Sequence, residues 1–515
     1  MRPGLNDIRS WIAAAAPGGR LVSDSRRVQP GDVFFAYPGD AQDGRRFIGA
    51  AADAGAAAIV YDDQDFTWPE AVATPHLAVA GLKQLAGPIA HAVLGQPDSA
   101  MFTVAVTGTN GKTSCALWTA QALARLGETA GVIGTLGVGV IAPKAKTEAQ
   151  FDVTGYTTPD AVLLAQTLAE LNGKGVTALA IEASSIGLVQ QRTAGMHVDV
   201  AIFTNLTRDH LDFHGDMASY EAAKVTLFEW PGLKHAVVNL DDAAGQRLVA
   251  HLRANFPALA VTGYTLDAVT TAAAVAPDGV AVLRASGMRS KNAGTECQVE
   301  TPAGSATIRS RLVGNYNVSN TLAVLGALLA RGVALKSAVE AIESLVPAPG
   351  RMQQMGGQDA PMVVIDYAHT PDALEKTLDA LRQVAADRGG QLWCVFGCGG
   401  DRDPGKRPQM GRIAQAADQV LVTSDNPRSE EPAAIIAQIV AGMDANAPGS
   451  RLQTVEDRAS AILLAVKQAA KQDVILLAGK GHEPYQEIKG RKMPFSDTDH
   501  ASLALTARLT MLRTH

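Results

Sequence analysis

The sequence is short of cysteine and of long apolar runs, and each shortage excludes a class of protein. The chain has 515 residues and four cysteines, which show neither paired zinc-ligand spacing nor a disulfide framework: Cys115, Cys297, Cys394 and Cys398. This usage indicates a reducing compartment. No segment reaches the roughly 20 uninterrupted apolar residues of a membrane span. The run "WIAAAAPGG" is too short for a signal core, because it ends at Pro17 and follows Asp7. We therefore expect a cytoplasmic protein without a membrane partner.

The chain also lacks an excess of positive charge. Its formal net charge is -6, which argues against a nucleic-acid partner. Small anionic ligands remain possible, because net charge describes the surface field and not a single site. Apolar residues make up 47% of the chain and charged residues 19%, an ordinary composition for a soluble protein. We expect small-molecule substrates and a monomer.

A chain of this length is too long for one hydrophobic core, and its patterns divide it into three α/β domains. Residues 1–98 hold short strand-like runs between Gly and Pro turns, which predicts a small N-terminal α/β domain. Residues 99–346 alternate apolar strands with helices, which predicts a mostly parallel sheet. Between about 260 and 313 the segments shorten and alternate, which predicts an appended antiparallel sheet. After the Pro-rich "VPAPG", residues 347–515 begin a third strand–helix series, a Rossmann-like C-terminal domain.

The strongest single motif is "VTGTNGKTS", in which an apolar strand runs into a Gly-containing turn and then a helix. Backbone N–H groups of such a turn face a phosphate, a lysine adds positive charge, and a Thr hydroxyl can ligate Mg²⁺. The usual G-x-x-x-x-G-K-[ST] pattern fails here, because position 106 is valine. What remains is Gly108-x-x-Gly111-Lys112-Thr113. The strand before it and the helix after it favour a phosphate loop over a chance match.

Carboxylates and imidazoles follow two later strands of the same predicted sheet. Glu182 ends the strand in "AIEASS", and Asp209, His210 and His214 stand in "TNLTRDHLDFHG". Side chains of these types near a phosphate loop are candidate metal ligands. Each has a structural alternative as well: His214 could cap a helix, for example.

Lys224 lies in the predicted helix "SYEAAKVTLFEW", where the i, i+4, i+8 spacing predicts one helical face shared with Tyr220 and Phe228. Such an amine usually extends to solvent. An ammonium group cannot bind Mg²⁺, whereas a lysine carbamylated by CO₂ carries a carboxylate and can.

The predicted strands of the third domain end in unusually charged turns, among them "GCGGDRDPGKR" and "SDNPR". Asp, Asn and Pro are ordinary turn residues, but a turn does not require Arg428. In open α/β sheets ligands bind outside the carboxyl ends of the strands. We therefore expect a further substrate at this edge.

Taken together, the motifs resemble the Mur ligase family, the ATP-dependent amino-acid-adding enzymes of peptidoglycan synthesis. The resemblance rests on "TGTNGKT", "EASS", "TNLTRDHLDFHG", "YEAAK", "GNYNVSN", "PGRM" and "DYAHTPDAL", which follow one another in the family's order. The N-terminal "SDSRRVQPGDVFFAYPG" and the pair "TT" at 157–158 are similar to members that act on UDP-MurNAc-L-Ala-D-Glu.

The resemblance implies a role for each matching residue. The residues implied for ATP are Gly108, Thr109, Asn110, Gly111, Lys112, Thr113, Asn317, Arg351 and Asp366. Those implied for the UDP-MurNAc-dipeptide are Ser25, Thr157, Thr158, Ser184, Gln190 and Arg192. Those implied for Mg²⁺ are Thr113, Glu182, His210 and Lys224 as its carbamate, and the catalytic set is Lys112, Lys224, His210 and Glu182. Tyr156 and Ser23 depart from the family's asparagine and leucine, which leaves the fine contacts to the nucleotide substrate open.

The implied reaction is ATP-dependent amide formation at the D-Glu side-chain carboxylate through an acyl phosphate. The third substrate is expected to be meso-diaminopimelate, because "DNPR" resembles the motif of the diaminopimelate-adding members and Arg428 suits bidentate binding of its extra carboxylate. The residues implied for it are Arg402, Asp425, Asn426, Pro427, Arg428, Gly479 and Glu483. The alternatives are an L-lysine-adding ligase, a folylpolyglutamate synthetase, and, in a different class, a nucleotide-gated binding protein.

Overall fold

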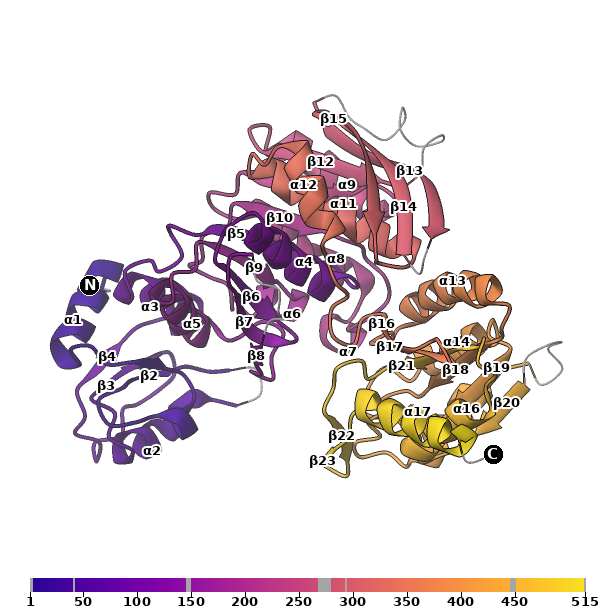
Figure 1. The fold of residues 1–515 in the computed structure, drawn as a ribbon. Helices are drawn as coiled ribbons and strands as arrows, with labels where there is room; N and C mark the ends of the chain where they lie inside the picture. Colours follow the sequence, from indigo (N-terminus) through magenta and orange to yellow (C-terminus); the bar gives the residue numbers. More distant parts are fainter. Residues whose placement is uncertain are drawn as a thin grey trace.

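The computed structural model describes residues 3–39, 42–144, 150–266, 279–291, 294–444 and 451–513. The chain forms three bodies in sequence order, each built on its own sheet with helices against it (Figure 1). A mixed α/β architecture with parallel sheets and appended antiparallel strands, as the sequence predicts, is confirmed. In the described part of the chain, no helix is both long enough and apolar enough to cross a membrane.

The N-terminal body is a four-stranded parallel sheet in the order β1-β2-β3-β4. Its strands are short and its apolar side chains pack on both faces, as in Phe34 and Phe35, which are both buried. Its elements are α1 (Leu5–Ala15), β1 (Leu21–Val22), η1 (Ser25–Arg27), β2 (Val33–Ala36), η2 (Gly44–Phe47), α2 (Ile48–Asp53), β3 (Ala58–Tyr61), β4 (His76–Ala78) and α3 (Leu82–Val93).

The central body carries an eleven-stranded sheet in the order β15-β14-β13-β12-β11-β10-β5-β9-β6-β7-β8. Its first half comprises β5 (Phe102–Thr107), α4 (Lys112–Arg125), β6 (Ala130–Gly134), β7 (Gly137–Ile141), β8 (Phe151–Asp152), α5 (Ala161–Gly173), β9 (Ala178–Glu182), α6 (Ser185–Val189) and β10 (Val200–Phe203). Its second half comprises α7 (Leu211–His214), α8 (Met217–Val225), η3 (Thr226–Glu229), β11 (His235–Asn239), α9 (Ala243–Asn255), β12 (Ala260–Thr265), β13 (Ala281–Lys291), β14 (Gly294–Thr301), β15 (Gly304–Ser310), α11 (Asn315–Ala330) and α12 (Leu335–Glu343).

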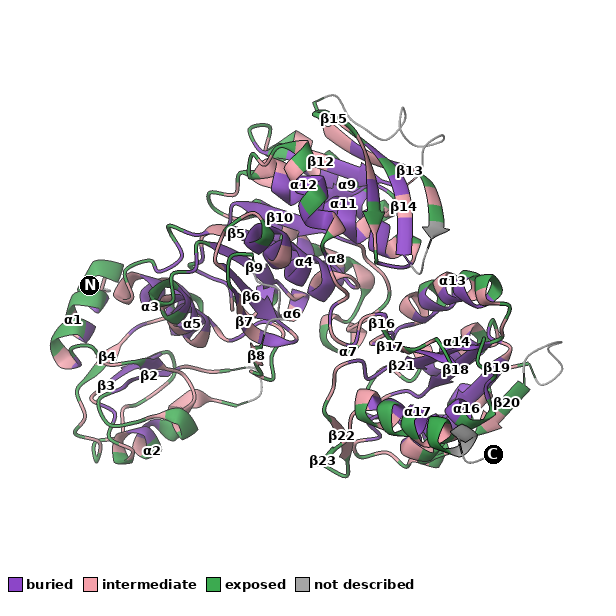
Figure 2. Ribbon diagram, in the orientation of Figure 1, coloured by how far each residue is buried: buried purple, intermediate pink, exposed green. Residues whose placement is uncertain are grey.

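The middle of this sheet is parallel, and both of its edges are antiparallel. Strands β13, β14 and β15 form the antiparallel extension that the sequence predicts, and β13 joins the sheet by pairing in parallel with β12. At the other edge, β6, β7 and β8 form an antiparallel meander that the sequence patterns did not indicate. Apolar clusters cover both faces, so the middle strands are buried (Figure 2).

The C-terminal body is a six-stranded sheet in the order β16-β17-β21-β18-β19-β20, in which only β16 pairs antiparallel. Green, exposed positions line the outer face of α17, while the strands behind it are buried (Figure 2). Its elements are β16 (Gln353–Gly356), β17 (Met362–Asp366), α13 (Pro371–Arg388), β18 (Leu392–Phe396), α14 (Lys406–Ala414), β19 (Gln419–Val422), α15 (Pro432–Val440), β20 (Arg451–Thr454), α16 (Arg458–Gln468), β21 (Val474–Ala478), β22 (Tyr485–Ile488), β23 (Arg491–Pro494) and α17 (Asp497–Arg513).

The order of the central strands brings the sequence motifs together. Strand β5 leads into the phosphate loop and lies between β9 and β10, with Val106 paired with Glu182 and Thr107 with Phe203. Strand β6 lies on the other side of β9, with Ile133 paired with Ile181. Because these strands are parallel, their carboxyl ends meet at one edge of the sheet.

Candidate active site

The phosphate loop connects β5 to α4, and two glycines fix its shape. Gly108 and Gly111 have φ values of 148° and 88°, which favour glycine. A Cβ at position 108 would lie 1.9 Å from Oγ1 of Thr204, and one at position 111 would lie 2.5 Å from Oδ1 of Asn320. Since α4 begins at Lys112, the N-terminus of a long helix faces the mouth of the loop, as phosphate binding requires.

Lys112 folds back over this loop. Its Nζ donates hydrogen bonds to the backbone oxygens of Gly108 and Thr109, both at 2.9 Å. Burial lowers the pKa of Lys112, although the nearby carboxylates of Glu182 and Asp209 oppose that shift. The ammonium group is therefore held at the loop next to acceptors that a phosphate can replace.

Thr113 and Glu182 meet at the end of the loop. The Thr113 hydroxyl lies 3.0 Å from Oε2 of Glu182, and Nη2 of Arg351 lies 3.3 Å from the same hydroxyl oxygen. A guanidinium can only donate and an ionised carboxylate can only accept, so Thr113 accepts from Arg351 and donates to Glu182. Arg351 belongs to the segment that leads into the C-terminal body, so this contact joins two bodies at the phosphate loop.

Lys224 is completely enclosed. The residue is 1% exposed, its Nζ donates to the Gly108 oxygen at 2.8 Å, and the same atom lies 4.3 Å from the ring centroid of Tyr220. The usual extension of a lysine to solvent is thus absent here. Burial, followed by the charge of Lys112, holds the pKa of Lys224 well below its ordinary value. The expected helical face with Phe228 is only partly right, because α8 ends at Val225 and Phe228 lies in the 3-10 helix η3.

A second polar group forms around Asp209. Nε2 of His210 lies 3.6 Å from Oδ2 of Asp209, and Nε2 of His369, from the C-terminal body, lies 3.8 Å from the same atom. Burial alone would raise the pKa of Asp209, but the hydrogen bond and charge of His369 and the charges of His210 and Lys406 hold it well below the ordinary range.

Within the described residues, no three His, Cys, Asp or Glu side chains are grouped closely enough to hold a metal ion by themselves. Glu182 and Thr113 form one spot, and His210 forms another with Asp209. His214 belongs to neither, because its Nε2 bonds the Ser185 hydroxyl at 2.9 Å. A cation at either spot would need oxygens from a bound phosphate, which is the usual arrangement for Mg²⁺.

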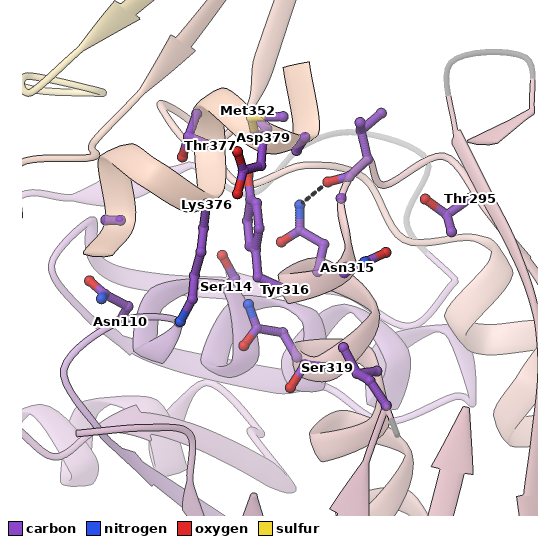
Figure 3. Close-up of a pocket in the computed structure, with 18 of the residues that line it drawn as sticks. Asn110, Ser114, Thr295, Asn315, Tyr316, Ser319, Met352, Lys376, Thr377 and Asp379 are labelled. Atoms are coloured by element: carbon purple, nitrogen blue, oxygen red, sulfur yellow. Dashed lines mark hydrogen bonds between the residues drawn. The ribbon is translucent and has the colours of Figure 1, made fainter. Parts of the chain in front are cut away.

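A large cavity opens between the phosphate loop and the C-terminal body. It has a volume of about 870 Å³ and is lined by Asn110, Gly111, Asn317, Arg351 and Asp366, all of them expected nucleotide contacts. Figure 3 shows Tyr316 and Ser319 of α11 on one side of this cavity and Lys376, Thr377 and Asp379 of α13 on the other. Tyr316 and Ser319 lie in the quoted "GNYNVSN" but were given no role there, and the three α13 residues lie beyond the quoted "DYAHTPDAL".

The cavity walls are tied together across the two bodies. Nδ2 of Asn110 donates to Oδ2 of Asp372 at 3.1 Å. Asp366 accepts from the backbone N–H groups of Met352 and Ala368, both at 2.8 Å. Burial raises the pKa of Asp366, although the Arg351 charge and these two hydrogen bonds oppose the shift.

The residues implied for the nucleotide-linked peptide include four that are hydrogen-bonded to one another: Thr158, Ser184, Gln190 and Arg192. The Thr158 hydroxyl donates to the Glu182 backbone oxygen at 2.8 Å and lies 3.0 Å from the Ser184 hydroxyl. Arg192 donates to the Thr158 backbone oxygen and to Oε1 of Gln190, both at 2.8 Å.

Thr157 is not bonded directly to these four, and its hydroxyl oxygen lies 3.0 Å from that of Thr135. Ser25, at the start of η1 in the N-terminal body, makes no hydrogen bond to the other five in the described chain. Ser23 and Tyr156 are the two residues that depart from the family pattern. The Ser23 hydroxyl donates to Asp160, the N-cap of α5. Tyr156 is 50% exposed, and its ring centroid lies 5.9 Å from the Arg192 guanidinium.

The charged turns of the C-terminal body also converge. Asn426 donates to Oε2 of Glu483 at 2.8 Å and accepts from Nζ of Lys480 at 3.0 Å. A Cβ on Gly479 would lie 2.5 Å from Oδ2 of Asp425, so this position requires glycine. Lys480, which is fully buried, is a member of this cluster that the motifs missed.

Arg428 lies at the border of this cluster with φ of 51°. Its Nη1 donates to the Gly400 oxygen at 2.7 Å, and its Nε lies 3.4 Å from Oε2 of Glu487. Its Nη2 makes no hydrogen bond to a described residue, so the guanidinium keeps donors for a ligand. Arg402 is exposed. It lies with Arg428 beside Gly399: a Cβ added at Gly399 would lie 2.9 Å from Nη1 of Arg428 and 3.7 Å from Cγ of Arg402. Pro427 completes the turn between Asn426 and Arg428.

The comparisons with known proteins agree with this geometry. Three family models match: "Mur ligase family, catalytic domain" over residues 20–94, "Mur ligase middle domain" over 106–328 and "Mur ligase, glutamate ligase domain" over 350–481. A relative in Janthinobacterium sp. (strain Marseille), named UDP-N-acetylmuramoyl-L-alanyl-D-glutamate–2,6-diaminopimelate ligase, is 60% identical over 98% of this chain and 97% of its own.

Two solved structures are similar over the whole chain. One carries the same ligase name, has 35% identity and a TM-score of 0.65, and covers 95% of both chains. The other is a MurF ligase from Thermotoga maritima in complex with ADP, with 18% identity, a TM-score of 0.64, and coverage of 96% of this chain and 98% of that one. The second likeness shows the fold alone.

One prediction concerns His482, which precedes Glu483. Burial and the Arg351 charge lower the pKa of His482 to about 4, although the nearby Thr135 backbone opposes the shift. The folded protein then binds fewer protons than the unfolded chain, whose histidines titrate near pH 6.5. Because the unfolded chain protonates His482 first, we expect this residue to lower the free energy of unfolding as pH falls from about 6.5 to about 4. Below about pH 4 it should cause no further loss.

Imidazole NMR signals of wild type and His482→Gln identify the residue, and pH-dependent unfolding of both gives its contribution. A His482 midpoint near pH 6.5 would contradict the prediction, as would identical pH dependence of unfolding in the two proteins.

Proposed function

The chain belongs to the Mur ligase family and is an ATP-dependent amide-forming ligase, and from that premise we propose that it joins meso-diaminopimelate to the D-Glu side-chain carboxylate of UDP-MurNAc-L-Ala-D-Glu. The observation that carries the proposal is the hydrogen bond between Thr113 and Glu182 at the phosphate loop, because the backbone oxygen of the same Glu182 also accepts from Thr158, a residue implied for the peptide substrate. The relative that is 60% identical carries the name of this activity.

The proposed reaction has two steps. A D-Glu carboxylate oxygen forms a bond to the γ-phosphorus of ATP, and ADP leaves. The neutral amine of the amino acid then attacks the acyl carbon, phosphate leaves with the bonding electrons, and the amine loses a proton. The loop N–H groups and Lys112 neutralise charge that develops on the transferred phosphoryl group.

We assign the three substrates to three domains: residues 1–98 with the uridine end, 99–346 with ATP, and 347–515 with the amino acid. Contacts between the last two already span the cavity, through Arg351 with Thr113 and Asn110 with Asp372. Closing these walls around the acyl phosphate excludes the water that would hydrolyse it.

The residues at the loop fit Mg²⁺. Oγ1 of Thr113 and Oε2 of Glu182 lie 3.0 Å apart beside the phosphate loop, and hydroxyl and carboxylate oxygens are the ligand types that Mg²⁺ would take. We assign Thr113 and Glu182 to one ion, and His210 and Lys224, as its carbamate, to the surroundings of a second. When bound, such ions neutralise phosphate charge and hold the reacting oxygens in line. In the protein itself, Arg351 and Glu182 orient the Thr113 hydroxyl.

The enclosure of Lys224 supports the proposed carbamylation. Only a neutral amine attacks CO₂, and a lowered pKa increases the neutral fraction. The neutral amine forms a new N–C bond to CO₂ and loses one proton, which gives a carbamate, an anion that can bind Mg²⁺.

We expect Lys224→Ala to lose ligation almost completely, by about 10³-fold or more, and to regain part of it with added short carboxylates, which supply the missing anionic oxygen. A Lys112→Ala variant is the matched control and should not be rescued. In wild type, ¹³C-bicarbonate should give a carbamate signal that Lys224→Ala lacks. Full activity of Lys224→Ala, or no labelled carbamate in the wild type, would contradict the assignment.

The choice of amino acid rests on Arg428. Lysine lacks the distal carboxylate of meso-diaminopimelate, so a partly buried guanidinium would lose its partner when lysine binds. We expect discrimination against L-lysine on the order of 10³-fold or more. Glu483, held by Asn426 and Lys480, suits the amine of the same end of the ligand.

Competition kinetics with both amino acids test this assignment, with product masses and phosphate release as readouts. Arg428→Ala should raise KM for meso-diaminopimelate and reduce discrimination, and Arg428→Lys should recover little, because it keeps the charge but loses the planar fork. Equal use of lysine by the wild type would identify the lysine-adding alternative. Unchanged use of diaminopimelate by Arg428→Ala would remove Arg428 from the site.

The remaining alternatives have less support. Folylpolyglutamate synthases share the fold at 19% identity but cover 77% of this chain. A nucleotide-gated binding protein has no use for a buried lysine at the phosphate loop or for the cluster around Asn426.

A further inference from the structure

The turn between β6 and β7 is built around the Glu182 carboxylate. Strand β6 lies beside β9 in parallel, so Gly134 ends its strand next to Glu182. A Cβ at position 134 would lie 2.1 Å from Oε1 and 2.7 Å from Cδ of Glu182. Any side chain here would therefore displace the carboxylate, and glycine lets the backbone of the turn approach it.

Thr135 uses that approach to bind both carboxylate oxygens. Its backbone N–H donates to Oε1 at 2.8 Å, and its hydroxyl lies 3.1 Å from Oε2. Glu182 is only 2% exposed, so its charge depends on protein donors in place of water. Thr113 donates the third hydrogen bond to this carboxylate. Thr135 therefore supplies two of the three hydrogen bonds that fix the plane of the carboxylate.

The direction of the hydrogen bonds extends this arrangement to Thr157. An ionised carboxylate only accepts, so the Thr135 hydroxyl gives its single proton to Glu182. The same oxygen lies 3.0 Å from the Thr157 hydroxyl, which must then be the donor in that contact. The chain therefore runs from Thr157 through Thr135 to Glu182, and on the other side from Arg351 through Thr113 to Glu182.

The same turn also contacts the C-terminal body. His482 lies close enough to the Thr135 backbone for that backbone to favour its protonated form, and it directly precedes Glu483 of the charged cluster. Thr135 thus contacts an expected metal ligand, an expected peptide-binding residue and the loop of the expected amino-acid site. No motif in the sequence indicated it.

We propose that Thr135 is a positioning residue for the ligation, which orients the Glu182 carboxylate toward the phosphate loop and couples that orientation to the residue that holds the peptide substrate, Thr157. The inference rests on the proposed function, because it assigns Glu182 and Thr157 their roles there. In this role Thr135 acts through its hydrogen-bond partners Glu182 and Thr157, and is assigned no contact of its own with the reacting atoms.

Two substitutions separate the role of the hydroxyl from that of the fold. Thr135→Val keeps the shape and the backbone N–H but loses the hydroxyl, and Thr135→Ser keeps the hydroxyl. We expect kcat of Thr135→Val to fall by about 10–100-fold, as for other residues that orient a metal ligand, and Thr135→Ser to stay within a few fold of wild type. The matched control is Thr167→Val, whose hydroxyl bonds only the Leu163 oxygen of its own helix.

A second readout needs no turnover. Calorimetric titration with Mg²⁺ and ADP should show affinity reduced by about tenfold in Thr135→Val and unchanged in Thr135→Ser and Thr167→Val. In kinetics, the Thr157→Val effect should be several-fold smaller in the Thr135→Val background than in wild type, because the two hydroxyls act through one chain.

The outcomes distinguish this inference from the proposed function. If wild type ligates diaminopimelate while Thr135→Val keeps wild-type kcat and Mg²⁺–ADP affinity, the positioning role is wrong and the function stands. Equal losses in Thr135→Val and Thr135→Ser would also overturn it, since they would reflect packing and not the hydroxyl. A wild type without ligation would refute the proposed function, whatever the titrations show.

Discussion

The arrangement of the site depends on one constraint. Glu182 is buried where the parallel strands of the central sheet end, so both oxygens of its carboxylate need hydrogen-bond donors and nearby positive charge. Glu182 is 2% exposed and accepts hydrogen bonds from Thr113 and Thr135. Burying an ionised group without such partners costs several kcal/mol. The parallel pairing of β9 with β5 and β6 supplies the donors, because it places the phosphate loop on one side of Glu182 and the β6–β7 turn on the other.

The C-terminal body completes this centre from outside the central sheet. It brings Arg351 to Thr113, His369 to Asp209 and the His482 loop to the β6–β7 turn. Each of these contacts is electrostatic, and Arg351 also lines the large cavity between the two bodies. The same body carries the cluster around Asn426, which we propose for the amino acid.

Short motifs indicated the parts of the site that local sequence encodes. The phosphate loop, Glu182 at a strand end and the "DNPR" turn each follow an apolar strand, and a strand followed by such a turn is visible in the sequence. Thr135, Lys376 and Lys480 were not visible, because their importance arises from strand order and from the approach of distant segments. The burial of Lys224 was also not visible in the sequence. The spacing of residues along a helix predicts which of them share a face, but not which other segments pack over that face.

The central claim of this account is that the D-Glu carboxylate becomes an acyl phosphate beside Glu182. Labelling the D-Glu side-chain carboxylate with ¹⁸O tests it most directly, since one oxygen of that carboxylate must leave with the phosphate when the amine attacks. The account predicts that mass spectrometry finds one ¹⁸O atom in each released phosphate and one in the amide product. Unlabelled phosphate, or label in AMP, would contradict it.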